Sequence, residues 1–149
     1  MARLVNWSFI WSARVPPKVR LFALGVCRNG LPTVMNFERR GVKIQGACPW
    51  CGSAQEDILH SLLRCPFPRQ VWALSHLRWS IISQGHEDPE AWLRCLHRML
   101  DSEDFCRALL TYWFLWGSRN RLIFENLQDS TGIVMEKIRC FEDALKKQS

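Results

Sequence analysis

Four residues of the types that bind zinc follow one another over a short stretch: Cys48, Cys51, His60 and Cys65. The CxxC pair places two ligands on one tight turn, and the HxxxxC pair reaches back from a following short helix. Three thiolates and one imidazole complete a tetrahedron and leave no position for a water molecule. The spacing therefore predicts a structural Zn²⁺ site; the alternative is a set of ordinary buried cysteines with a hydrogen-bonded histidine.

The elements that position these ligands are predicted from the residues around them. Ser53 and Glu56 have the spacing of a capping box, so we expect a helix to begin directly after the CxxC turn and to carry His60. Pro66 should end this helix just past Cys65. Residues 43–45 are expected to form a short strand that leads into the turn.

Positive charge is concentrated before the predicted metal site. The chain has 149 residues and a formal net charge of +6, and residues 1–47 hold eight basic residues against Glu38 alone. A one-sided field of this kind favours polyanions such as RNA or DNA, although a solvated basic face that keeps a small domain soluble is the alternative. The candidate phosphate-binding residues are Arg14, Lys18, Arg20, Arg28, Arg39, Arg40 and Lys43.

The first half of the chain resembles the zinc-binding region at the C-terminal end of reverse transcriptases in plant LINE-type (non-LTR) retrotransposons. The matching pieces are Trp7–Trp11, Pro16–Phe22, Leu31–Thr33, Arg39–Gly41, the four ligands with Glu56, and Val71-Trp72. Trp116–Phe124 also resembles a segment found downstream of that region, before a ribonuclease-H-like domain. Leu24 stands where the family usually has tryptophan. The resemblance implies a module that helps the enzyme to hold its template, together with other parts of a retroelement polyprotein.

Short helices are predicted in the N-terminal part. Pro16-Pro17 should begin one helix, and a second should run from Pro32 to Gly41. Its last turn carries Arg39 and Arg40, which suit either the helix dipole or a phosphate. The aromatic residues of the first matching piece could stack on unpaired bases or anchor the core, and the core is the favoured interpretation: Trp7, Ile10 and Trp11.

The C-terminal part is predicted to be a helical hairpin or small bundle. Apolar residues recur at helical spacing after an Asp88-Pro89 start, after Asp101 or Ser102, and after a break at residues 128–132. A helix over Val71 to Leu77 should pack back on the zinc module. We therefore predict a mainly α protein, with a zinc-stapled domain at residues 1–82 and a helical region at residues 83–149.

Catalysis is not predicted. Polymerases and nucleases need clustered carboxylates for two metal ions, whereas the acidic residues here lie mostly at predicted helix starts. Cys95, His97 and Cys106 lack a fourth ligand for a second metal site; with Cys27 and Cys140, the two cysteines are expected to be small core residues. The odd cysteine number and the absence of a long apolar stretch favour a reducing compartment, in the nucleus or cytoplasm, and no membrane role.

Two functions follow from the sequence. The first is a non-catalytic, zinc-stabilised module derived from a reverse transcriptase, which binds RNA or DNA through its basic N-terminal third. The second is a zinc-stabilised structural or protein-interaction module that binds no nucleic acid. Charge reversal at Arg20, Arg39 and Arg40 should abolish binding in the first case only.

Overall fold

The computed structural model describes residues 6–41, 46–84 and 88–148, and these residues are mainly helical, as predicted. No strand occurs in these three ranges, and the strand expected at 43–45 lies outside them. The elements in chain order are α1 (Ser8–Trp11), α2 (Pro17–Cys27), α3 (Val34–Arg39), the π-helical turn η1 (His60–Arg64), α4 (Pro66–Leu74), α5 (Trp79–Ile82), α6 (Pro89–Met99), α7 (Ser102–Glu125) and α8 (Thr131–Lys147).

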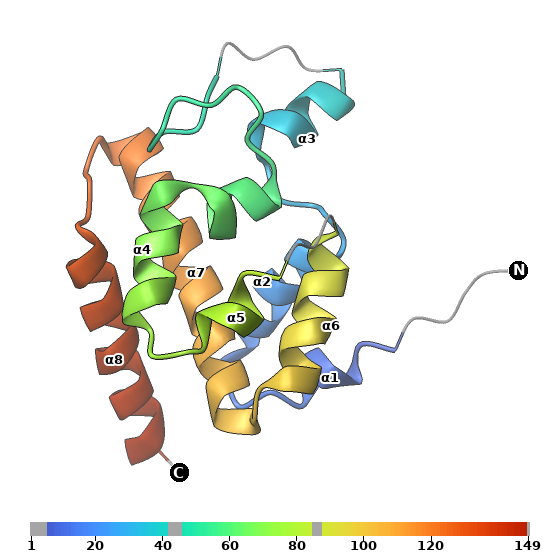
Figure 1. Cartoon of the computed structure of the whole chain (residues 1–149), viewed down its shortest axis with the longest axis vertical. Coiled ribbons are helices and arrows are strands. Elements are labelled where there is room, and N and C mark those ends of the chain that lie inside the picture. The colour runs from blue at the N-terminus through green and yellow to red at the C-terminus, as the bar shows by residue number, and fades with distance from the viewer. Residues whose placement is uncertain (1–5, 42–45, 85–87, 149) are drawn as a thin grey trace, which may run out of the picture.

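The longest helix, α7, is the centre of the packing. It contacts α2, η1, α4, α6 and α8, and Figure 1 shows it running behind α4 with α8 along its side. Its buried side includes Tyr112, whose ring lies against Trp92 of α6 at 4.6 Å and against Trp72 of α4 at 5.7 Å between centroids. All three rings are fully buried. Aromatic side chains from three helices thus meet at one point of the core.

Several helix starts lie where the sequence placed them. The Asp88 carboxylate accepts the backbone N–H of Glu90 at 3.0 Å, and Asp101 accepts that of Asp104 at 2.8 Å. Ser130 caps α8 in the same way, through the N–H of Ile133 at 3.1 Å. Each side chain satisfies an N–H that has no partner within the helix. The pairing of α7 with α8 confirms the predicted C-terminal hairpin.

Three local predictions are wrong. The helix expected from Pro32 begins at Val34, because Thr33 is the cap and accepts the N–H of Asn36 at 3.2 Å. The helix expected over Val71 to Leu77 is α4, which ends at Leu74, and Leu74 does not pack back on the zinc module because it is 42% exposed. Cys140 is exposed on α8 and is not a core residue. Helix α5 was not predicted, since four residues carry almost no periodic signal.

The first aromatic segment divides between core and surface. Ile10 is fully buried and Trp7 packs against the core, whereas Trp11 is 46% exposed. The guanidinium of Arg94 lies 5.5 Å from the centroid of the Trp7 ring. The core interpretation therefore holds for two of these three residues.

The two predicted domains share one hydrophobic core. A single cluster of buried residues runs from Phe9 to Ile138, and α2 and η1 both contact α7. The autonomy of residues 1–82 stays a prediction, which the stability of that fragment would test.

Candidate metal centre

The four predicted ligands lie together. The Sγ atoms of Cys48, Cys51 and Cys65 and a ring nitrogen of His60 are all within 4.8 Å of one another. Cys48 and Cys65 are buried, His60 is half-buried and Cys51 is exposed. The first and last of these ligands, Cys48 and Cys65, are 17 positions apart in the sequence, and all four side chains converge on one centre.

The donor set fits zinc in both chemistry and spacing. Zinc–sulfur and zinc–nitrogen bonds of tetrahedral sites imply S···S separations of about 3.8 Å and S···N separations of about 3.5 Å. The Cys48 and Cys65 Sγ atoms are 3.9 Å apart, and Cys51 Sγ lies 3.2 Å from His60 Nε2. Four protein ligands complete the coordination, so the ion would stabilise the fold and would have no position for a reacting water.

The CxxC turn is held by its own backbone. The N–H of Gly52 donates to the Cys48 carbonyl at 2.8 Å, and the N–H of Cys48 donates to the Ser53 carbonyl at 2.8 Å. Gly52 has φ +80°, a left-handed conformation that costs glycine little and other residues considerably more. This loop keeps both thiols on the same side of the turn.

The second ligand pair is set by the π-helical turn η1. In an ideal α-helix, five residues advance by about 500°, which would leave two side chains about 140° apart around the axis. Here the N–H of Cys65 instead donates to the His60 carbonyl at 3.0 Å, which is the wider i→i+5 bond. Cys65 is extended, with φ −62° and ψ 144°, so the chain leaves the helix at this ligand. The wide turn therefore brings His60 and Cys65 to the same centre.

The capping box predicted at Ser53 and Glu56 is wrong. The cap of the ligand helix is Asp57, whose carboxylate accepts the N–H of His60 at 2.7 Å, and the helical turn starts at Ile58. Ser53 Oγ accepts only the nearby N–H of Gln55, at 3.2 Å. Glu56 is drawn away from the local backbone because a stronger tertiary partner is available.

That partner is Arg119 of α7. The Glu56 carboxylate is fully buried and accepts from Arg119 Nε at 2.6 Å and from a terminal guanidinium nitrogen at 2.5 Å. It also accepts the N–H of Val34 at 3.3 Å, while the Glu56 carbonyl accepts that of Met35 at 2.9 Å. The guanidinium lies 4.3 Å from the centroid of the Trp116 ring. One side chain of the metal loop thus joins α3 and α7.

A ring stack joins the two segments that carry the ligands. Trp50, inside the CxxC, stacks on Phe67, two residues after the last ligand, with centroids 4.7 Å apart and planes at 16°. This stack joins the segments that carry the first and second ligand pairs.

Burial shifts the pKa of three candidate ligands in the metal-free protein. It raises the pKa of the Cys65 thiol to about 12 and raises that of Cys48, whereas it lowers the pKa of His60. The thiols of Cys48 and Cys65 therefore hold their protons more tightly than an exposed cysteine does, and zinc binding should release these protons.

The candidate second site is not formed. Within the described part of the chain, the only metal-binding group is the one at Cys48, and Cys95 Sγ instead donates to Gln84 at 3.4 Å. The His97 ring packs against Phe9 and Phe105, at 5.4 and 5.1 Å between centroids. Packing thus accounts for two of these three residues.

The structure places most of the described basic candidates on α2 and at the end of α3. Lys18 lies over the rings of Trp113 and Phe141, at 5.5 and 5.7 Å, and Arg20 donates to the Ala13 carbonyl at 3.3 Å. Arg39 and Arg40 are exposed at the end of α3, which Figure 1 shows far from α1.

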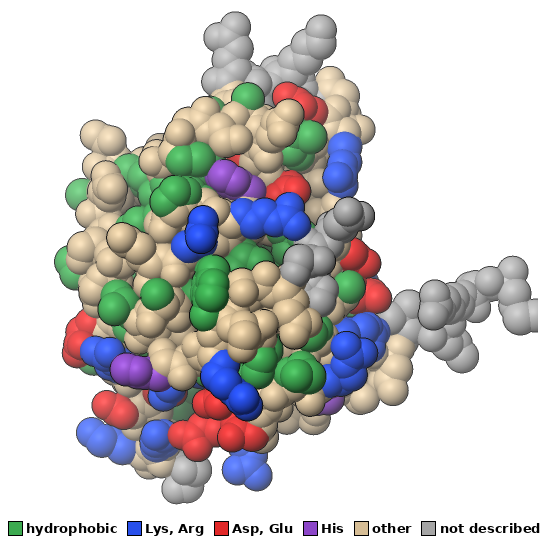
Figure 2. All heavy atoms as spheres, in the orientation of Figure 1, with side chains coloured by type: hydrophobic (Ala, Val, Ile, Leu, Met, Phe, Trp, Pro, Cys, Tyr) green, Lys and Arg blue, Asp and Glu red, His purple; other side chains and the backbone are tan. Residues whose placement is uncertain are grey.

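The remaining candidates lie elsewhere. Arg14 is exposed before α2, Arg28 is exposed at its end, and Lys43 lies outside the described residues. Figure 2 shows Lys and Arg side chains spread over the visible face and mixed with acidic ones at its lower edge. The described candidates are therefore distributed over α2, the segment before it and the end of α3.

Residues 2–72 match the family model described as zinc-binding in reverse transcriptase. The match contains all four candidate ligands and ends at Trp72 in α4, so it supports a zinc-binding domain in this part of the chain. Comparison with curated proteins and with solved structures gave no match. No described helix has the length and apolar character needed to cross a membrane.

Proposed function

We propose that this chain is a zinc-stabilised, nucleic-acid-binding module without catalytic activity of its own, derived from the reverse transcriptase of a plant LINE-type retrotransposon. RNA or DNA is its main partner, in the nucleus or cytoplasm. Other parts of the element's polyprotein are further partners. The observation that carries the proposal is the match to a zinc-binding region of reverse transcriptase in a chain whose excess positive charge precedes the metal site.

The charge distribution supports binding to a polyanion. Exposed arginines attract phosphates from any sequence, and each contact releases counterions. Arg28, Arg39 and Arg40 are exposed, and no ion pair to them occurs in the described ranges. They are better phosphate-binding candidates than Lys18, which lies over two rings, or Arg20, which is bonded to the backbone.

The test is fluorescence anisotropy of the zinc-loaded chain with labelled single-stranded and hairpin RNA across a salt series. Affinity should fall linearly on a log–log plot, with a slope near −0.7 for each phosphate contacted on a single strand. Absence of binding at low salt, by protein shown to hold zinc, would overturn the proposal.

Charge reversal tests which basic residues contribute to nucleic-acid binding. The triple variant Arg28→Glu, Arg39→Glu, Arg40→Glu should lose at least tenfold in affinity, because three attractive charges become repulsive. A matched control reverses Arg98, Arg139 and Lys147, three exposed residues of α6 and α8. If both triple variants lose affinity equally, the N-terminal assignment is wrong and only overall charge matters.

A protein-interaction module is the second candidate, and one observation favours it. Four exposed apolar side chains lie where α7 ends and α8 begins: Ile123 at 44%, Phe124 at 79%, Leu127 at 50% and Ile133 at 50% exposure. Apolar surface of this kind is common at protein contacts. This candidate becomes the better one if zinc-loaded protein binds no nucleic acid.

A further inference from the structure

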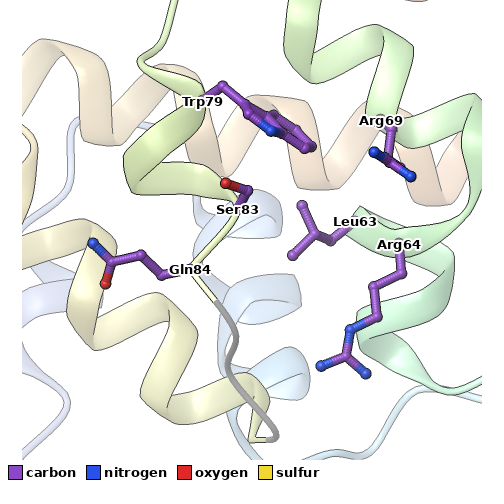
Figure 3. Close-up of a pocket in the computed structure, with 6 residues that line it drawn as sticks. All are labelled: Leu63, Arg64, Arg69, Trp79, Ser83 and Gln84. Carbon is purple, nitrogen blue, oxygen red and sulfur yellow. The ribbon is translucent and has the colours of Figure 1, made fainter.

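A hollow next to the π-helical turn that carries His60 has walls from three elements. Leu63 and Arg64 of η1 and Arg69 of α4 form one side, and Trp79 of α5 with Ser83 and Gln84 forms the other. Its volume is about 290 Å³. Figure 3 shows the indole of Trp79 above Leu63, with both arginines across the opening from Ser83.

An exposed indole and an arginine form the rim of this hollow. Trp79 is 39% exposed, and the Arg69 guanidinium lies 5.8 Å from its ring centroid. Both side chains also line a second hollow of about 410 Å³, with Pro66, Gln70 and Ala73. The Arg69–Trp79 pair therefore stands between two adjacent depressions.

The charged residues that the structure describes in these walls have one sign. The described residues that line the two hollows include Arg64 and Arg69 and no Asp or Glu. A cavity between α7 and α8 has a mixed lining: Glu103 and Glu142 stand there with Arg14, Arg107 and Lys146, and Arg107 donates a hydrogen bond to Glu142 at 3.1 Å. Carboxylates thus offset part of the positive charge at the α7–α8 cavity, whereas no described carboxylate does so beside Trp79, so an anionic ligand is favoured beside Trp79.

We propose that the hollow beside Trp79 binds an unpaired nucleotide of a single-stranded nucleic acid. The base stacks on the indole, and Arg69 contacts the adjacent phosphate. This inference rests on the proposed function, and it identifies the hollow as the place where the module binds unpaired bases. Stacking on aromatic rings with arginine at the backbone is the usual way in which proteins bind single strands, and it tolerates any base sequence.

The metal centre sets one wall of this site. Leu63 and Arg64 belong to the π-helical turn that carries His60, and Pro66, which lines the second hollow, follows the ligand Cys65. Loss of zinc should displace this wall, whereas Trp79 lies on a different element. Binding in the hollow is therefore expected to require zinc, in addition to any effect of overall charge.

The experiment measures the affinity of the zinc-loaded full chain for a fluorescein-labelled 12-nucleotide oligouridylate and for a labelled RNA duplex. Trp79→Ala removes the stacking surface and Trp79→Phe keeps a ring. Trp11→Ala is the matched control, since Trp11 is 46% exposed on α1. Arg69→Gln is paired with Arg98→Gln, another exposed arginine. Zinc content and thermal unfolding are compared for every variant.

We expect Trp79→Ala to weaken single-strand binding by about 5- to 100-fold and duplex binding much less. Trp79→Phe should recover most of this loss, and Trp11→Ala should change little. Arg69→Gln should lower the salt slope by about 0.7, whereas Arg98→Gln should not.

If the chain binds oligouridylate and Trp79→Ala binds it equally well, the hollow is not the site although the proposed function stands. A larger loss of affinity in Trp11→Ala than in Trp79→Ala would also contradict binding in the hollow, and would favour a binding site at the N-terminal segment. If wild-type protein binds neither RNA, the proposed function fails, and this inference fails with it.

Discussion

The metal end and the helical end of this molecule are held together by different forces. Residues 46–65 contain only one short helical stretch, and four candidate zinc ligands, one ring stack and a buried ion pair fix their path. Helices α6, α7 and α8 instead bury a continuous apolar side against each other and against α2 and α4. Chelation should therefore affect the first end strongly, and packing changes should affect the second.

The Glu56–Arg119 pair is where the two ends depend on each other. Both side chains are almost completely removed from water, at 0% and 5% exposure. A buried pair adds little net stability compared with apolar residues of the same shape, but removal of one partner leaves a charge without compensation. The pair thus makes the path of the metal loop sensitive to α7.

Loss of zinc should have the largest effect, because it should destabilise the metal end much more than the helical end. Removal of zinc by a chelator, or Cys48→Ser, should abolish hydrogen-exchange protection over residues 46–65, because structural zinc supplies about 10–16 kcal/mol of binding free energy to small modules. Protection in α6–α8 should fall much less. Hydrogen exchange with mass spectrometry measures both, and Cys140→Ser is the control, since this thiol is exposed and lies outside the metal group. Equal loss in all helices would contradict the comparison.

The second prediction concerns the Glu56–Arg119 ion pair that links the two ends. Glu56→Gln and Arg119→Met should each lower the free energy of unfolding by about 3–5 kcal/mol, whereas the double variant should lose clearly less than the sum of the two. Urea unfolding of the zinc-loaded protein measures this.

Arg121→Met is the control for the link, because Arg121 is half-exposed and its carboxylate contacts are 3.8 Å long. The Arg121→Met substitution should lower the free energy of unfolding by no more than about 1 kcal/mol. Additive losses for Glu56 and Arg119 would show that the two ends are independent.

The smallest effect concerns Cys27 of α2, a helix that packs against α6 and α7 of the helical end. Burial raises the pKa of the Cys27 thiol from 9.0 to about 12, so above pH 9 the unfolded chain loses a proton that the folded chain keeps. Stability from this group is complete below pH 9 and is lost as the pH rises toward 12. At pH 10 the loss is about 1.4 kcal/mol. Urea unfolding at pH 8 and pH 10 should show it in wild type and not in Cys27→Ala; an identical pH dependence would contradict it.

Local signals sufficed for part of this structure. The spacing of cysteines and histidine predicted the group at Cys48, and Asp88 and Asp101 predicted the starts of α6 and α7, because each feature lies within a few residues of its effect. The role of Glu56 was missed, because its partner is 63 positions away and overrides the local capping pattern. The π-helical turn and α5 were missed because neither has a distinctive periodic pattern.

The ion pair also limits how this chain can be divided. A fragment that ends with the family match at Trp72 would keep the Glu56 carboxylate and lose Arg119, its only guanidinium partner in the described residues. Such a fragment would have to admit water to the interior or leave the Glu56 carboxylate buried without a compensating cation. Genetic exchange that moved the metal motif alone into another protein would meet the same problem, so heritable units of this module should extend through α7.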